Sequence, residues 1–257
     1  MKLQVDINCD LGESYGVFKI GDDKKIMPHI TSANIACGFH AGDPTVIMQT
    51  VKLAKKHNVA IGAHPAFPDL MGFGRREMQL ANEEIKDYVI YQAGAIQGFA
   101  TTVAERLQHV KPHGALYNMA TKNEKISKAI AEAVKALDKQ LIIFAPPNSA
   151  LAKAAKKAKL RVAHEFFADR AYNLDGSLVS RKDPRAIISK PREVVNRAIK
   201  AVTEKRVICV NGETLAFESI HTICVHGDSP SATKLVVALK KGLEKAKVKV
   251  TQVGNFV

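Results

Sequence analysis

The strongest constraint on the fold of this chain is an alternation of short apolar runs with amphipathic segments that repeats about seven times. Several apolar runs are continuous, as in strands that are buried on both faces of a parallel sheet. The runs that we expect to form strands are residues 3–7, 31–36, 59–63, 109–111, 141–145, 160–164 and 220–225. Stripes with helical spacing follow most of them. This order predicts repeated βα units around a parallel sheet.

Two of the predicted helices have clear start signals. Asp43-Pro44 and Ser229-Pro230 each place an N-cap residue before a proline at the first helical position, where the missing N–H costs nothing. Further amphipathic stripes lie at residues 85–96, 126–137, 150–158 and 191–202. Near the end of the chain, residues 207–217 have Asn211-Gly212 at their centre, which predicts a small β-hairpin with a type I′ turn.

Seven βα units in 257 residues fit either a closed parallel barrel or an open doubly wound sheet. The open sheet usually has a glycine-rich nucleotide loop after its first strand, and residues 10–16 (Asp-Leu-Gly-Glu-Ser-Tyr-Gly) are neither G-x-G-x-x-G nor a P-loop. No repeat or linker marks a boundary within the chain. We therefore expect one α/β domain over residues 1–257, a seven-stranded parallel (β/α) barrel of the TIM-like kind with the hairpin as an insertion.

The net charge of +13 raises the question of a nucleic-acid or membrane partner. Most of the excess lysines fall on the polar faces of predicted helices, where they are solvated. There is no tryptophan and no interleaving of aromatic and basic residues of the kind that stacks on bases. No apolar run of about 18 residues occurs, and the first residues lack the apolar segment of a secretion signal. We expect neither a nucleic-acid partner nor a membrane partner.

The four cysteines form no C-x-x-C pair, which favours the reducing cytoplasm.

The first predicted strand carries polar residues at period two. Asp6, Asn8 and Asp10 therefore point to the same face, which is the interior in a barrel. Three buried polar groups need partners, and so they indicate a site. Cys9 points to the opposite face, so we do not expect it to be a nucleophile.

Reactive side chains also gather at the predicted carboxyl ends of other strands. Four histidines, among them His40, His64 and His113, follow strands beside glycine or proline, and Asp228 follows the last strand. Together with Asp10 these are catalytic candidates, because such groups either bind a divalent metal or transfer protons at neutral pH. Their spacing leaves both roles open.

A second set of residues is suited to binding an anionic substrate. Arginine holds carboxylates with two hydrogen bonds, and loop 65–76 resembles a lid that ends in two arginines. The candidates for substrate binding are Asn8, Asn34, Arg76, Lys111, Glu165, Asp169 and Arg170.

Several blocks of this sequence resemble the LamB/YcsF lactam-utilisation family. The blocks are Asp-Ile-Asn-Cys-Asp-Leu-Gly-Glu at 6–13 and the segments 32–44, 62–76, 110–118, 167–172 and 225–228. The resemblance implies a barrel of the glycoside hydrolase/deacetylase type. It also implies one component of the bacterial and archaeal ATP-hydrolysing 5-oxoprolinase, which converts 5-oxo-L-proline to L-glutamate with ATP as co-substrate and includes partner subunits B and C.

On this interpretation, Asp10, His64 and His113 would activate water, either directly or as ligands of a divalent metal, and His40 and Asp228 would assist. Lys111 and Arg76 would offset charge on the reacting oxygen, and Arg170 would hold the substrate carboxylate. No P-loop or kinase glycine loop occurs, so the ATP site could lie on any of the subunits. Two alternatives stay open: a metal-dependent deacetylase of amide-bearing sugars, and a lactam-binding subunit without catalysis.

Overall fold

Seven parallel strands form a closed barrel in the computed structural model, which describes residues 3–257. Each strand pairs with the next, and the last pairs back with the first. The strands are β1 (Gln4–Leu11), β2 (Ser32–Ala36), β3 (Ala60–His64), β4 (Leu107–Val110), β5 (Ile142–Ala145), β6 (Arg161–Phe167) and β9 (Thr222–Val225). The predicted seven-stranded barrel is confirmed, and β1 extends four residues beyond the predicted run.

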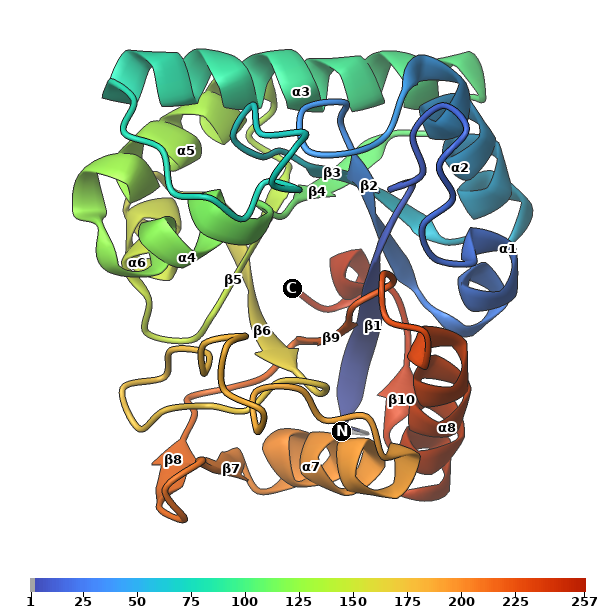
Figure 1. The fold of residues 1–257 in the computed structure, drawn as a ribbon, viewed down its shortest axis with the longest axis vertical. Helices are drawn as coiled ribbons and strands as arrows, with labels where there is room; N and C mark the ends of the chain where they lie inside the picture. The colour runs from blue at the N-terminus through green and yellow to red at the C-terminus, as the bar shows by residue number, and fades with distance from the viewer. Residues whose placement is uncertain (1–2) are drawn as a thin grey trace.

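Helices surround the barrel as a ring (Figure 1). They are α1 (Asp23–Ile26), α2 (Pro44–Lys56), α3 (Asn82–Thr102), α4 (Gly114–Lys122), α5 (Glu124–Leu137), α6 (Ala150–Lys157), α7 (Pro191–Thr203) and α8 (Ala232–Lys245). The predicted start of α2 is confirmed: Asp43 Oδ1 accepts hydrogen bonds from the N–H groups of Thr45 and Val46. Helix α4 has no counterpart among the predicted helices. In the part of the chain that the structure describes, no helix is long and apolar enough to span a membrane.

Two local predictions are wrong. Helix α8 begins at Ala232 and not at Pro230, because the Ser229 carbonyl and hydroxyl first form a turn with Ala232 and Ser231. The hairpin of β7 (Arg206–Ile208) and β8 (Thr214–Ala216) exists, but Ile208 pairs with Thr214, so the loop has five residues. A type I′ turn needs positive φ at both central residues, and only Gly212 has it.

The two sides of the barrel wall differ in polarity. The outward face, with Ile7, Cys9 and Ile35, belongs to the apolar core beneath the helices. Inside, Phe144 and Val253 belong to a small apolar cluster. Val253 lies in the final segment, which β10 (Lys249–Val250) connects to the start of β1. Most of the remaining interior is polar, and Phe167 of β6 lies beside Lys111 there.

Candidate active site

The interior column on β1 is fully hydrogen-bonded. The Asp6 carboxylate accepts from the hydroxyls of Thr31, Ser32 and Thr222 at 2.5–2.7 Å. Asn34 Nδ2 donates to Asn8 Oδ1 at 2.7 Å and to Asp10 Oδ1 at 2.8 Å. These contacts follow from the register, which places Asp10 beside Asn34 on β2 and Asp6 beside Thr222 on β9. The column therefore links three strands of the barrel.

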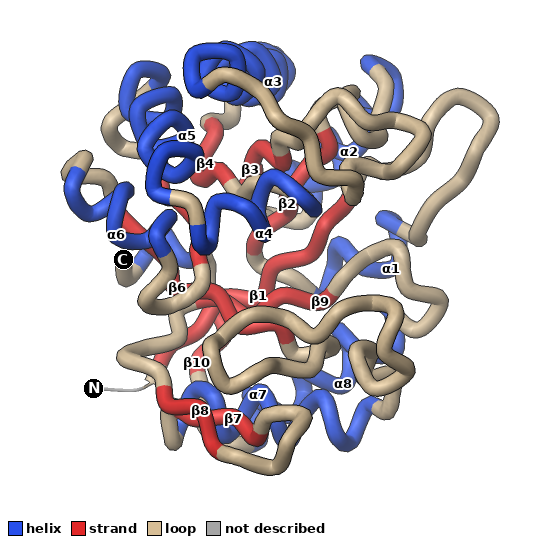
Figure 2. Tube along the Cα trace, turned by 60° about the vertical axis from the view of Figure 1, so that its left-hand side comes forward, coloured by secondary structure: helices blue, strands red, loops and turns tan. Residues whose placement is uncertain are grey.

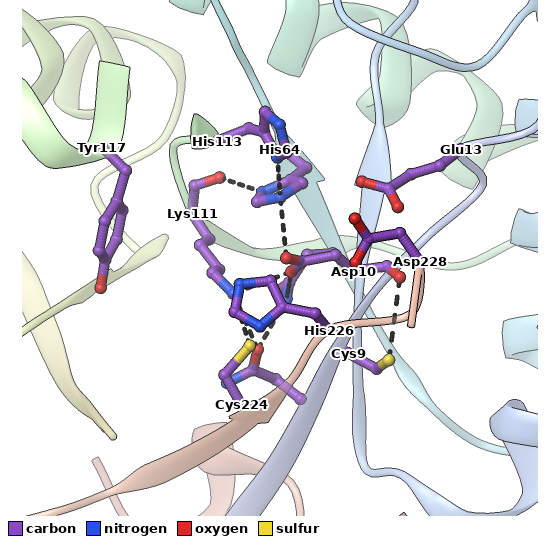
Figure 3. A network of polar contacts seen from close by, with 12 residues as sticks. Cys9, Asp10, Glu13, His64, Lys111, His113, Tyr117, Cys224, His226 and Asp228 are labelled. Atoms are coloured by element: carbon purple, nitrogen blue, oxygen red, sulfur yellow. Dashed lines mark hydrogen bonds and ion pairs between the residues drawn. The ribbon is translucent and has the colours of Figure 1, made fainter. Parts of the chain in front are cut away.

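Lys111 lies at the centre of the site, at the end of β4, and is 2% exposed (Figure 3). Its Nζ lies 2.8 Å from Asp10 Oδ1, 3.0 Å from Glu165 Oε1 and 3.0 Å from Cys224 Sγ. Burial disfavours the ammonium charge, but Asp10, Cys224 and Glu165 together outweigh it and hold the pKa of Lys111 well above its usual value. The site thus contains one buried cation between two buried carboxylates.

Besides its ion pair with Lys111, Glu165 on β6 accepts hydrogen bonds from two neutral donors. The Tyr117 hydroxyl on α4 donates to Oε2 at 2.6 Å, and Asn8 Nδ2 donates to Oε1 at 3.0 Å. Asp10 instead faces a histidine, with Oδ2 3.4 Å from His64 Nε2. Burial raises the pKa of Asp10, but His64 and Lys111 overcome this and hold it well below its ordinary value. Asp10 is therefore ionised at neutral pH.

Three histidines and Glu13 occupy the mouth of the barrel next to Asp10. His64 Nε2 lies 3.0 Å from His113 Nδ1, and the His113 ring stacks on that of His40 with centroids 3.8 Å apart. Glu13 Oε1 lies 3.5 Å from His40 Nε2. One ligand atom from each of these four residues lies within 4.8 Å of the others, so they are the residues of this site that could hold a metal ion.

The loop after β3 covers these histidines. Gly74 has a positive φ of 65°, and a Cβ at this position would lie 2.8 Å from both the His113 ring and the Cβ of His40. The next residue, Arg75, forms an ion pair of 2.5 Å with Asp228, which crosses from this loop to the loop after β9. Asp10, Lys111 and His113 are at most 4% exposed beneath it. Substrate entry requires this cover to move.

Three predicted residues are bound to other parts of the protein. Arg76 pairs with Asp69 of its own loop, and 68% of its side chain is exposed. Arg170 donates to the carbonyls of Val179 and Ala186 and so holds together the loop after β6. Asp169 accepts from the backbone N–H and Nδ1 of His226 at 3.0 Å. The structure does not bring Arg76 into the cluster around Lys111.

Similarity to known proteins extends over nearly the whole chain. The family model described as the LamB/YcsF family matches residues 5–257. The chain belongs to the LamB/YcsF family. The A subunit of a 5-oxoprolinase from Pyrococcus abyssi is 50% identical over 255 residues, which cover 99% of this chain and 100% of that protein.

The structure of a lactam utilization protein from Thermus thermophilus has the same fold as this member of the LamB/YcsF family. Its TM-score is 0.91 at 46% identity, covering 96% of this chain and 99% of that one. The catalytic domain of a peptidoglycan N-acetylglucosamine deacetylase from Eubacterium rectale has a TM-score of 0.53 at 7% identity, covering 98% and 89%. That likeness concerns the fold alone, and it agrees with the predicted deacetylase-type barrel.

The predicted site residues of this LamB/YcsF chain did not include Glu13, Tyr117 and Cys224. They included Arg75 only as one of the two arginines that end loop 65–76, and His226 only as the fourth histidine that follows a strand. Tyr117 and Cys224 could have been predicted from the sequence. Tyr117 lies one helical turn after His113. Cys224 lies two residues after Thr222, so both point to the inward, polar face of the same strand. The contact between Arg75 and Asp228 joins two loops, and no local pattern encodes it.

Proposed function

We propose that this chain is the ring-opening component of a 5-oxoprolinase, which uses ATP and includes partner subunits B and C. The observation that carries the proposal is the buried Lys111 ammonium between Asp10 and Glu165, beside paired histidines at the carboxyl end of the barrel. The relatives that are named as the A subunits of 5-oxoprolinases, which match over nearly the full length, support the choice of substrate.

A five-membered lactam is a stable amide, and ATP makes its opening favourable by phosphorylating the lactam oxygen. Water then adds to the ring carbon and gives up a proton, and the C–N bond breaks as the ring nitrogen gains one. The resulting acyl phosphate reacts with a second water to give L-glutamate and phosphate. The phosphorylation step belongs to the complex, and the ring-opening step belongs to this site.

The residues around Lys111 supply what ring opening needs. Asp10 is ionised and lies against His64, so the pair can take the proton of the attacking water. The Lys111 ammonium offsets negative charge that develops on the oxygen atoms at the ring carbon. For the substrate carboxylate we propose Arg75, whose ion pair with Asp228 would open when the covering loop moves, whereas Arg76 and Arg170 are held by Asp69 and by backbone carbonyls.

We propose that the partner subunits dock over the mouth of the barrel. Large exposed apolar side chains concentrate in the long loops after β1, β3 and β6, which lie at this end (Figure 2). Val17, Phe18 and Met71 are 86%, 70% and 92% exposed, and Leu174 and Ile187 continue the apolar rim. A partner bound there would shield a reactive phosphorylated intermediate from water.

All four cysteines are free and buried, which fits a reducing cytoplasm.

The test is to mix this protein with subunits B and C, 5-oxoproline and ATP, and to measure glutamate. Asp10→Asn and His113→Ala should abolish glutamate formation while the circular dichroism spectrum stays native. Exposed Lys128→Met is the control and should keep full activity. Normal turnover by either site variant would refute the assignment, and undiminished turnover with bound lactam would indicate a binding subunit. Release of acetate from N-acetylated sugars without ATP would indicate a deacetylase instead.

A further inference from the structure

The hydrogen-bond partners of His64 and His113 fix where their protons lie. A carbonyl oxygen only accepts, so a ring nitrogen facing it must carry a hydrogen. His64 Nδ1 lies 2.7 Å from the Lys111 carbonyl, and His113 Nε2 lies 2.9 Å from the Phe73 carbonyl. In neutral rings the other nitrogens, His64 Nε2 and His113 Nδ1, then carry lone pairs, and these two atoms are 3.0 Å apart. Two facing lone pairs repel unless a cation lies between or beside them.

His40 also has ring nitrogens that lack a partner. Its side chain is fully buried, and neither ring nitrogen has a hydrogen-bond partner among residues 3–257. The ring is nearly parallel to that of His113, with an interplanar angle of 4°, so the two rings are stacked face to face. Glu13 approaches His40 Nε2 from the loop after β1. A buried polar ring without a partner requires an explanation.

We propose that Glu13, His40, His64 and His113 together bind one divalent transition-metal ion of the Zn²⁺ class. Three imidazoles and one carboxylate suit Zn²⁺ or Co²⁺, whereas Ca²⁺ and Mg²⁺ prefer oxygen donors. Ligand atoms around tetrahedral zinc lie about 3.3 Å apart, given bonds of about 2.0–2.1 Å. The distances of 3.0 Å between His64 and His113 and 3.5 Å between Glu13 and His40 lie on either side of that value.

The surroundings of the four residues also fit a metal. Metal-binding histidines commonly donate their second N–H to a backbone carbonyl, as His64 and His113 do here. A metal takes imidazole in its neutral form. The carbonyl contacts at His64 Nδ1 and His113 Nε2 leave the lone pairs of these two rings on the nitrogens that face each other.

This ligand set differs from the one predicted from the sequence, which was Asp10, His64 and His113. Asp10 Oδ1 already accepts from Asn34 and Lys111, and the Lys111 ammonium balances its charge. Asp10 Oδ2 lies 3.4 Å from His64 Nε2, where it can support a metal ligand without being one. The metal site goes beyond the proposed function, because a metal on His64 Nε2 would leave Asp10 to take the proton of the attacking water, and ring opening does not require the metal.

The competing explanation is a proton. A positively charged His64 would donate from Nε2 to His113 or Asp10 and remove the conflict between lone pairs without a metal. The two explanations differ in what they predict for His40 and Glu13. A proton on His64 leaves both of them without a role, whereas a metal ion requires them.

The test is metal binding by the full chain after treatment with a chelator. Titration with Zn²⁺ should give one equivalent bound per chain, and Co²⁺ should give the visible absorption bands of a four-coordinate site. Glu13→Gln keeps the size of the side chain, and we expect it and His40→Ala to weaken Zn²⁺ binding at least about a hundredfold. The control is His221→Ala, which alters another stacked histidine pair, His164 and His221, and should leave binding unchanged.

Three results would overturn the proposal: no binding of either metal, binding that survives both variants, or an equal loss in His221→Ala. If His40→Ala unfolds, Glu13→Gln decides alone, because a glutamine in place of glutamate removes the charge but not the volume. A failure here is distinguishable from a failure of the proposed function, because glutamate formation by the complex is measured separately from metal content.

Discussion

Lys111→Met tests the energetics of the buried cation directly. The change keeps a side chain of similar length but leaves Asp10 and Glu165 buried without their counter-charge. At 2.8 and 3.0 Å, and with an effective dielectric constant of about 20, each contact is worth about 6 kcal/mol before desolvation. Releasing Lys111 from its burial offsets part of this. We expect a net loss of about 3–5 kcal/mol in the free energy of unfolding, as for other broken buried pairs.

The assay is urea denaturation at pH 8 and at pH 5, followed by circular dichroism. Removing the ammonium takes away one of the groups that hold the pKa of Asp10 below its ordinary value, so the pKa of Asp10 rises in the variant. A carboxyl group with a less depressed pKa contributes less stability at every pH above its unfolded pKa, so the deficit relative to the wild type should persist at both pH 8 and pH 5. Adding Glu165→Gln to Lys111→Met removes one of the two uncompensated charges and should restore part of the loss.

A matched comparison comes from an exposed ion pair. Lys128 lies 3.7 Å from Glu132 on the surface of α5, with 76% of the lysine side chain exposed. Lys128→Met should cost less than about 0.5 kcal/mol. If Lys111→Met costs no more than Lys128→Met, or if Glu165→Gln fails to restore stability, the reasoning about the central cation is refuted.

Three further predictions concern other parts of the molecule. Burial raises the pKa of Asp6 from 3.8 to about 6, so the wild type loses stability as the pH rises through that interval. Asp6→Asn should remove about 3 kcal/mol of this loss. The loss is measured as the difference between the free energies of unfolding at pH 4 and at pH 7. Gly62→Ala places a Cβ against the His109 ring and should destabilise by about 1–3 kcal/mol. Phe18→Asp should weaken binding of the partner subunits without changing the melting temperature.

Each of these has its own control. An unchanged pH slope in Asp6→Asn would contradict the argument from burial. Gly98 on α3 has no atom within 4 Å of an added Cβ, so Gly98→Ala should have the opposite sign and stabilise slightly; equal effects at both glycines would contradict the steric reasoning. Ile208→Asp changes an exposed residue of β7, outside the loops after β1, β3 and β6, and should leave partner binding intact; a loss there as large as for Phe18→Asp would argue against the proposed docking surface.

The fold was predictable from the sequence because its signals are local. A continuous apolar run indicates a buried strand, and a side-chain cap such as Asp43 fixes a helix start within two residues. The errors occur where the deciding contact is not in the pattern. Helix α4 is short and follows β4 without a polar cap, and β10 is two residues long and forms only because β1 is available to pair with it.

The site was predictable in part for the same reason. Period-two alternation placed Asn8 and Asp10 inside the barrel, and the carboxyl ends of the strands brought His64, His113 and Lys111 together. A sequence pattern does not show which of several charged neighbours a long side chain contacts. Arg75 reaches Asp228, whereas Arg76, the next residue, turns back to Asp69.

The polar column of β1 limits how this protein can change over evolution. The side chains that hold Lys111 in place also connect three strands of the wall, so a substitution at Asn8 or Asp10 alters chemistry and architecture together. The side chains of the covering loops are not part of this column. New substrate preferences in such a barrel should therefore arise in residues 65–76 and 168–190, while the interior stays unchanged.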